Sequence, residues 1–381
     1  MGGCGKTGRG LGTIWAQSRG EIMQAGVGWS RRPASREAGR EAARHALRDL
    51  ERAGALFLFT TDGYDQEEVL EGVLAEAGST PLVGACGAGI VTPVGILKEG
   101  VAVLALAGKG LRVATAMTEF TAGDPWETGK KLGRQLTAGA AVSSGMVVVL
   151  PDGLAGSITE MLQGLYDELG PGFKCVGGGT GDNLRFIRSY QLTERGMASG
   201  AVAAALISGC AFGVAVEHGW RPMGSPLVVT GARGKVVYEL DARPAFTVYS
   251  ERLGGIEPEK FQEYGLRYPI GMPNAAGHFI LRDPLRVLPD GAIELVTEVP
   301  PRAVAYLMEA RAEDLLEVTR RVAVASLREV ALPVFALVFT CVSRSLLLGN
   351  GGREFEIYRE VFGPLPFAGF LTFGEVAAYD D

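Results

Sequence analysis

One stretch of sequence, which occurs twice along the chain, decides the predicted fold. It reads LFLFTTDGYDQEEVLEGVLAEAGSTPLVGACGAG over residues 56–89. An apolar run leads into Asp62-Gly63, and Asp65 with Glu68 forms the start of a helix that carries an apolar stripe. A second apolar run then opens into a glycine-rich turn. The stretch predicts a buried strand, a capped helix and a second buried strand.

The same order of features returns at residues 146–183, MVVVLPDGLAGSITEMLQGLYDELGPGFKCVGGGTGDN. Asp152-Gly153 follows the first strand, and Ser157 with Glu160 predicts the capping box of the helix. The two Asp-Gly pairs are 90 residues apart, so we expect an internal duplication. A weaker third copy runs from PVFALVFTC at 333–341 to FAGFLTFGEV at 367–376.

The region between the second and third copies is rich in predicted strands. Turn residues at 231–235 and at 289–291 predict two hairpins there. The predicted fold class is α/β (α+β), with two halves of mixed β-sheets flanked by helices. We divide the chain into a flexible extension at 1–20, a first domain at 21–218 and a second domain at 219–381.

Charge and composition exclude several functional classes. The chain has 381 residues, with 43 acidic against 37 basic side chains, which argues against a nucleic-acid partner. The uncharged run Gly196–Val216 is interpreted as a buried hairpin around Ser208–Cys210, so we expect no membrane association. Five widely separated cysteines and the absence of a signal sequence favour the cytoplasm. Three histidines without ligand spacing predict no metal and no cofactor.

Four ordered motifs resemble the FIST domain proteins, whose name joins F-box and intracellular signal transduction. They are GWRPMG with the following VVT (219–230), VYELDARPAFTVY (237–249), FTCVSR (339–344) and FAGFLTFGEVA (367–377). The glycine turns PLVGACGAG and VGGGTGDN are similar to two further motifs of the family. The resemblance covers about residues 22–379, which assigns the FIST N-terminal domain to 21–218 and the FIST C-terminal domain to 219–381.

This resemblance implies a sensory domain that binds a small polar ligand, such as an amino acid or a related metabolite. No output domain fits in the chain, so the resemblance implies a stand-alone protein that signals to a separate partner. The chain departs from the family pattern at Ile90, where an acidic residue is usual after the first glycine turn. The matching acid after the C-terminal turn, Glu375, is present.

The candidate ligand-binding residues lie at predicted strand ends and glycine turns. Arg344 could hold a ligand carboxylate through two hydrogen bonds, or it could form a structural ion pair. Cys341 could be a thiol activated by Arg344, or an inert core residue. The remaining candidates are Thr372 and Glu375 for a hydroxyl or cationic group, the amides of Gly177, Gly178 and Gly179, and Asp182, Asn183 and Cys86.

Two alternatives to a sensor stay open at this point. One is a thiol-dependent hydrolase or acyl transferase that uses Cys341 or Cys86 as the nucleophile, although the sequence shows no general base for it. The other is an adaptor that binds proteins and no ligand. We expect that the chain is not an enzyme.

Overall fold

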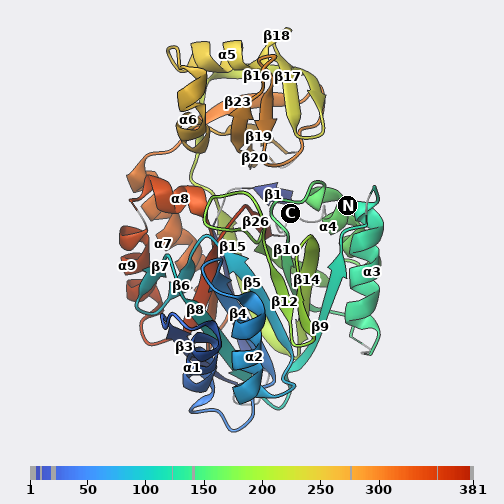
Figure 1. The fold of residues 1–381 in the computed structure, drawn as a ribbon, viewed down its shortest axis with the longest axis vertical. Helices are drawn as coiled ribbons and strands as arrows, with labels where there is room; N and C mark the ends of the chain where they lie inside the picture. Colours follow the sequence, from blue (N-terminus) through green and yellow to red (C-terminus); the bar gives the residue numbers. More distant parts are fainter. Residues whose placement is uncertain are drawn as a thin grey trace.

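The computed structural model describes residues 6–8, 11–18, 23–121, 123–139, 142–274, 277–349 and 351–377. Figure 1 shows two parts. The larger part, here called the core, contains three six-stranded sheets with helices on their outer faces. The smaller part, here called the module, comprises residues 221–309 and stands at one end of the core.

The core consists of three units that share one order of elements, to which the third unit adds one short helix. The first contains β3 (Gln24–Ser30), α1 (Ser35–Leu47), β4 (Ala55–Thr61), α2 (Gln66–Ala77), β5 (Leu82–Gly87), β6 (Ile90–Thr92), β7 (Gly95–Leu97) and β8 (Val101–Ala107). The second contains β9 (Arg112–Glu119), α3 (Pro125–Thr137), β10 (Gly145–Pro151), α4 (Ile158–Leu169), β11 (Phe173–Gly178), β12 (Gln191–Thr193), β13 (Gly196–Ala198) and β14 (Ala201–Ser208).

The third unit is assembled from both ends of the chain. It contains β15 (Cys210–Glu217), α7 (Ala312–Arg328), β24 (Ala336–Cys341), α8 (Val342–Leu347), α9 (Gly352–Phe362), β25 (Phe367–Thr372), β26 (Glu375–Ala377), β1 (Lys6–Gly8) and β2 (Leu11–Ser18). The strand β2 lies between β15 and β24 in the sheet. Residues 6–8 and 11–18 therefore form strands, and the prediction of a flexible extension at 1–20 is wrong for them.

Each unit contributes one pair of strands to the sheet of a neighbouring unit. The sheets have the orders β13-β12-β5-β4-β8-β3, β1-β26-β11-β10-β14-β9 and β15-β2-β24-β25-β6-β7. At the centre of each lies a parallel pair, and its helices cover the outer face. The predicted α/β class is confirmed, and the duplication extends to the third copy that the sequence indicated.

The predicted hairpin at 196–216 is wrong in its pairing. Strands form at Ala201–Ser208 and Cys210–Glu217, as expected, and Gly209 turns between them with a φ of 87°. The first pairs with β10 and β9, whereas the second pairs with β2 in another sheet. Gly209 therefore marks the passage from the second unit to the third.

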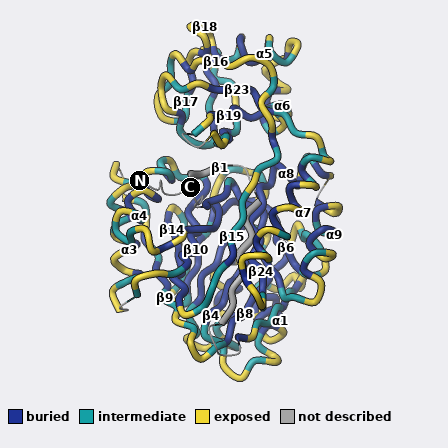
Figure 2. Tube along the Cα trace, turned by 180° about the vertical axis from the view of Figure 1, so that it is seen from behind, coloured by how far each residue is buried: buried dark blue, intermediate teal, exposed yellow. Residues whose placement is uncertain are grey.

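The inner faces of the three sheets share one hydrophobic core. Phe59 of the first unit stacks on Phe370 of the third at 5.4 Å between ring centroids, and Phe339 contacts both rings edge-on. Met146, Val148 and other inner-face residues of the second unit belong to the same cluster. Figure 2 shows the buried strands inside and the exposed residues on the helices and loops.

Three backbone hydrogen bonds join the glycine turns of the units end to end. The Ala88 amide donates to the Leu371 carbonyl (3.1 Å), the Gly181 amide to the Cys86 carbonyl (2.9 Å) and the Phe373 amide to the Gly179 carbonyl (2.9 Å). Within these three bonds, each turn donates to one neighbour and accepts from the other. We call this arrangement the ring.

The module is an antiparallel sheet with two α-helices on it. Its elements are β16 (Arg221–Arg233), β17 (Val236–Leu240), β18 (Arg243–Pro244), α5 (Ala245–Arg252), η1 (Pro258–Lys260), α6 (Phe261–Arg267), β19 (Ile270–Pro273), β20 (Phe279–Arg282), β21 (Pro284–Val287), β22 (Ile293–Leu295) and β23 (Val304–Glu309). It is inserted between β15 and α7, so the predicted second domain at 219–381 contains both the module and most of the third unit. Both predicted hairpins are confirmed as β16–β17 and β21–β22.

A buried ion pair fixes both crossings of the chain between the module and the core. Arg344 of α8 and Glu354 of α9 are fully buried and lie 2.9 Å apart. Arg344 also donates to the carbonyl of His218, at the entry to the module, and to that of Leu315, after its exit, at 2.8 and 2.9 Å. Of the two sequence interpretations of Arg344, the structure shows the internal ion pair, and its guanidinium is not exposed to a ligand.

The helix pairs of the first two units are close because glycines face the backbone of the neighbouring helix. A Cβ added to Gly129 in α3 would lie 1.9 Å from the carbonyl oxygen of Met161 in α4. The same added atom on Gly39 in α1 would lie 2.2 Å from the carbonyl oxygen of Val69 in α2. These helices can therefore approach only where the side chain is absent.

We predict that Gly129→Ala lowers the free energy of unfolding by about 1–3 kcal/mol, because the methyl group overlaps the α4 backbone. Intrinsic helix propensity alone would give the opposite result, because it favours alanine over glycine by about 1 kcal/mol. Gly352→Ala in α9 is the matched control, since an added Cβ there has no atom within 4 Å. Urea denaturation of both variants measures the difference. Equal stabilities for Gly129→Ala and the wild type would show that the contact does not determine the packing.

We also predict that Arg344→Met destabilises the protein by about 3–5 kcal/mol, because it leaves the Glu354 carboxylate buried without its cation. The double variant Arg344→Met with Glu354→Leu should recover much of this loss, since it removes both charges. A double-mutant cycle on urea midpoints tests the coupling. If the losses of stability in the two single variants simply add in the double variant, the ion pair does not stabilise the fold.

Candidate functional site

The candidate site is the cleft between the module and the core. The carboxyl ends of the parallel strands of all three units point toward this end of the core (Figure 1). In open α/β sheets this is the end at which ligands bind. The module stands over this end, and the cleft lies between the two parts.

Two adjoining cavities make up the cleft. One has a volume of about 480 Å³ and lies beside Lys235, Arg286 and Glu294 of the module and Arg185 of the core. The other, of about 70 Å³, lies beside Cys341. Both are lined by Phe186, Gln262, Leu285 and Val296, so they are parts of one site. This mixture of apolar walls and a few charged groups is typical of small-molecule sites.

A buried carboxylate, that of Asp182, shapes the loop on the core side of the cleft. Asp182, which is 1% exposed, accepts hydrogen bonds from four successive backbone amides, those of residues 185–188, at 2.7–3.2 Å. These bonds hold Leu184 and Phe186 at φ values of 60° and 55°. Residues other than glycine rarely adopt this left-handed region of the backbone. Such strain is found most often at ligand sites and switches.

A third left-handed residue, Ser157, joins the core to the module across the same cleft. Its φ is 63°, and its hydroxyl donates to the carboxylate of Glu298. The predicted capping box of α4 is therefore wrong, because this hydroxyl bonds the module and not the helix. Asp65, in contrast, caps α2 as predicted, by accepting from the Glu68 amide at 3.0 Å.

Charges of both signs line the cleft. Lys235 reaches the carbonyls of Leu154 and Ala155 at 3.3 and 3.4 Å. Partial burial lowers the pKa of its ammonium group, and the carboxylates of Glu298 and Glu294 oppose this shift. Arg286 pairs with Glu294 at 2.5 Å, and Arg185 on the facing wall pairs with Asp62. The site can therefore offer cations to a ligand carboxylate and anions to a ligand ammonium group.

The glycines of the second turn are used by the protein itself. Gly177 and Gly178 lie in β11, opposite Val376 and Glu375 of β26, and the Gly179 amide donates to the Gly374 carbonyl at 2.8 Å. The predicted anion-binding nest is thus a strand end whose amide at position 179 is already bonded. Asn183 is exposed, and its backbone amide donates to the Asp62 carboxylate at 3.2 Å.

Thr372 and Glu375 form a buried pair below the cleft. The Thr372 hydroxyl donates to the Glu375 carboxylate at 2.7 Å, and both residues are at most 2% exposed. A ligand in the cleft does not reach them in this arrangement. Thr372 lies directly against the second glycine turn, since a Cβ added to Gly178 would be 2.4 Å from the Thr372 side chain.

The two candidate thiols differ in position. Cys86 is fully buried, and desolvation, with Asp62 and Asp182 nearby, raises the pKa of its thiol. Cys341 lines the smaller cavity, and its sulfur lies 2.8 Å from the Ser343 hydroxyl. Of the predicted site residues, Cys341 is the one that contacts the cleft directly.

His218 does not supply a base for either thiol. Its Nδ1 accepts a hydrogen bond from the Trp220 amide at 2.9 Å. Burial and the nearby Arg344 guanidinium lower the pKa of its imidazole to about 4. The geometry therefore gives no support to a hydrolase with a Cys-His pair at this histidine.

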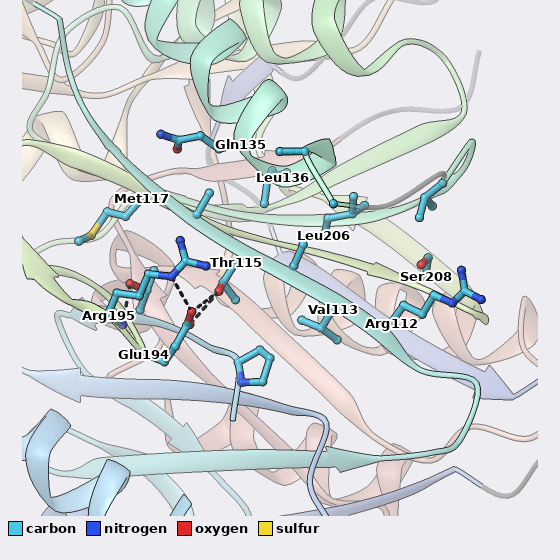
Figure 3. Close-up of a pocket in the computed structure, with 17 residues that line it drawn as sticks. Arg112, Val113, Thr115, Met117, Gln135, Leu136, Glu194, Arg195, Leu206 and Ser208 are labelled. Atoms are coloured by element: carbon cyan, nitrogen blue, oxygen red, sulfur yellow. Dashed lines mark hydrogen bonds and ion pairs between the residues drawn. The ribbon is translucent and has the colours of Figure 1, made fainter. Parts of the chain in front are cut away.

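A second and larger cavity lies away from the module. It is a groove of about 970 Å³ along β9, bordered by α3 and by the turn that carries Glu194 and Arg195 (Figure 3). The Thr115 hydroxyl donates to Glu194 at 2.7 Å, and Arg195 pairs with the same carboxylate at 3.2 Å. None of the predicted site residues borders this groove.

Sequence reasoning missed the residues that line the cleft. Arg185, Phe186, Lys235, Arg286 and Glu294 carried no motif of their own. The only sequence signal was the position of Asp182-Asn183 immediately before the strained loop. Lys235 lies in a turn of the module, and only the insertion of the module between β15 and α7 brings that turn over the core.

Comparison with known proteins adds the family. A model of the FIST N domain matches residues 54–243, and a model of the FIST C domain matches residues 245–378. Their boundary falls inside the module, between β18 and α5. Among the residues that the structure describes, no helix has the length and apolar character needed to cross a membrane.

Two relatives show the same extent of similarity. An uncharacterized protein of Mycobacterium tuberculosis is 28% identical over 371 residues, which cover 93% of this chain and 94% of the relative. An uncharacterized protein of Mycobacterium bovis is 26% identical over 372 residues, with coverage of 93% and 94%. With the two domain models matched in order along nearly the whole chain, this protein belongs to the FIST family.

Proposed function

We propose that this protein is a cytoplasmic sensor that binds a small polar ligand, an amino acid or a related metabolite, in the cleft between the module and the core. FIST domains are associated with sensing and signal transduction, which supports the class. The observation that carries the proposal is the cleft itself, where the left-handed residues Leu184 and Phe186 lie beside charges of both signs. A zwitterionic ligand matches this pattern of charges.

The proposed signal is a change in the position of the module. A ligand held between Lys235 or Arg286 of the module and Arg185 or Phe186 of the core contacts both parts at once. It therefore favours the position of the module in which both sets of contacts form. The shift in this equilibrium equals the difference between the ligand's affinities for the two positions of the module. The two chain crossings stay anchored to the core by Arg344, so the module turns about these points, and a separate partner protein responds to its position.

The enzyme alternative has less support. Cys86 is buried and its thiol pKa is raised, which opposes the thiolate that a nucleophile needs. Cys341 borders the cleft, but the imidazole of His218 is bonded elsewhere. The adaptor alternative predicts no stabilisation by any metabolite, and the same experiment tests it.

We predict that a panel of amino acids, small carboxylates and nucleotides contains a compound that raises the melting temperature of the purified protein. At about 100 times its dissociation constant, a ligand stabilises the folded state by about 2.7 kcal/mol, which a thermal-shift assay detects. Lys235→Met should abolish the response while the protein stays folded, since it removes the module's ammonium group from the cleft.

Arg320→Met is the matched control. Arg320 forms an exposed ion pair with Glu360 between α7 and α9, outside the cleft. It should keep the full ligand response. An equal loss in both variants would contradict the location of the site, and a wild-type protein that responds to no compound would contradict the ligand class.

A further inference from the structure

We propose that the groove along β9 binds an extended acidic segment of a partner protein, which adds to the sheet as a further strand beside β9. This proposal gives a contact surface to the separate partner of the proposed function. It depends on that function only for its role in signalling, because peptide binding in the groove is independent of the cleft.

One edge of β9 is free for pairing among the residues that the structure describes. All eight of its residues, from Arg112 to Glu119, are in register with β14, and no strand among the described residues pairs with its other side. An edge strand presents a row of backbone donors and acceptors to an incoming chain. Peptide recognition by strand addition uses these groups for affinity and the neighbouring pockets for selectivity.

The helix that covers β9 packs on its strand differently from the covering helices of the other two units. The strand registers place Gly26 of β3, Ala114 of β9 and Gly213 of β15 at equivalent positions. A Cβ added to Gly26 or Gly213 would lie 2.0 or 2.2 Å from a carbonyl oxygen of the covering helix, α1 or α7. In those units the helix backbone rests directly on the strand.

In the second unit larger side chains separate the helix from the strand. Ala114 carries the methyl group that Gly26 and Gly213 lack. Leu136 of α3 borders the groove together with Ala114 and Leu206 (Figure 3). Leu136 packs in one cluster with Ala116 and Ala114, so the groove beside β9 has an apolar floor. A strand with alternating apolar side chains requires such a floor.

The border of the groove is positively charged. The charged residues that border the groove are Arg112, Glu194 and Arg195, and Figure 3 shows the two arginines at opposite ends. The Glu194 carboxylate accepts from Thr115, from the Leu82 amide and from Arg195, so its charge is used within the protein. The rim is thus cationic on a chain whose net charge is −6. An acidic segment is complementary to it.

The test uses a fluorescein-labelled peptide, Glu-Val-Thr-Val-Glu-Val-Thr, and a matched peptide with lysine in both glutamate positions. We expect the glutamate peptide to bind the full-length protein saturably in fluorescence anisotropy, and about tenfold more tightly than the lysine peptide. Hydrogen exchange should show new protection of backbone amides in β9 when the glutamate peptide is bound.

A charge-swap variant makes the test specific to the groove. Arg112→Glu with Arg195→Glu should reverse the preference, so that the lysine peptide binds more tightly. The control, Arg320→Glu with Arg353→Glu, changes exposed arginines of the third unit and should leave the preference unchanged.

Several outcomes would overturn the proposal. The first is that the glutamate peptide shows no saturable binding up to about 1 mM, which is near the weakest useful affinity. The second is that both peptides bind equally well. The third is that the bound peptide protects backbone amides outside β9. If the charge-swap variant fails to bind peptide as expected but keeps its thermal shift with the metabolite, the groove proposal is wrong and the cleft proposal is not affected.

Discussion

The ring of three backbone hydrogen bonds constrains everything that surrounds it. It requires three glycine turns to meet closely enough for each amide to reach a neighbour's carbonyl, at 2.9–3.1 Å. The glycines at this meeting point leave no room for a side chain of their own. A Cβ added to Gly178 would lie 2.4 Å from the Thr372 side chain, and one added to Gly181 would lie 2.8 Å from the ring of Phe373. The glycines therefore serve the contact between units and leave no cradle for a ligand.

This constraint also explains where a ligand can bind. The carboxyl ends of the parallel strands converge on the ring, so the usual ligand position of an α/β sheet is already filled by protein backbone. The next available space lies above the ring, between the strained loop after Asp182 and the inserted module. The residues predicted from the glycine turns consequently support the site from below, and Cys341 alone among them reaches it.

The sequence revealed what depends on local periodicity. The strand-helix-strand copies at 56–89 and 146–183 were readable because apolar alternation, a helical stripe and turn residues occur within one short stretch. The third unit was only partly readable, since its sheet combines β2 near the start of the chain with β15, β24 and β25. No local pattern tells that residues 11–18 lie between strands that are some 200 and 330 residues away.

Arg344 shows a similar limit at the level of one side chain. Its position just after a buried strand is equally consistent with a ligand contact and with an internal ion pair, and only the placement of Glu354, Thr319 and the His218 carbonyl decides between them. Backbone strain at Leu184 and Phe186 has no sequence signature either, because neither residue favours a positive φ.

The differences between the three units bear more on function than their similarity. Equivalent registers place Thr61, Asp152 and Cys341 at the ends of the first parallel strands. Only the third unit has a thiol there, and this is also the unit that carries the module. Only the second has alanine where the others have a glycine beneath the helix, and this is the unit with the open groove. Since the shared core and the ring require the common features in every unit, the positions that are free to differ are those at which a binding site can arise without loss of the fold.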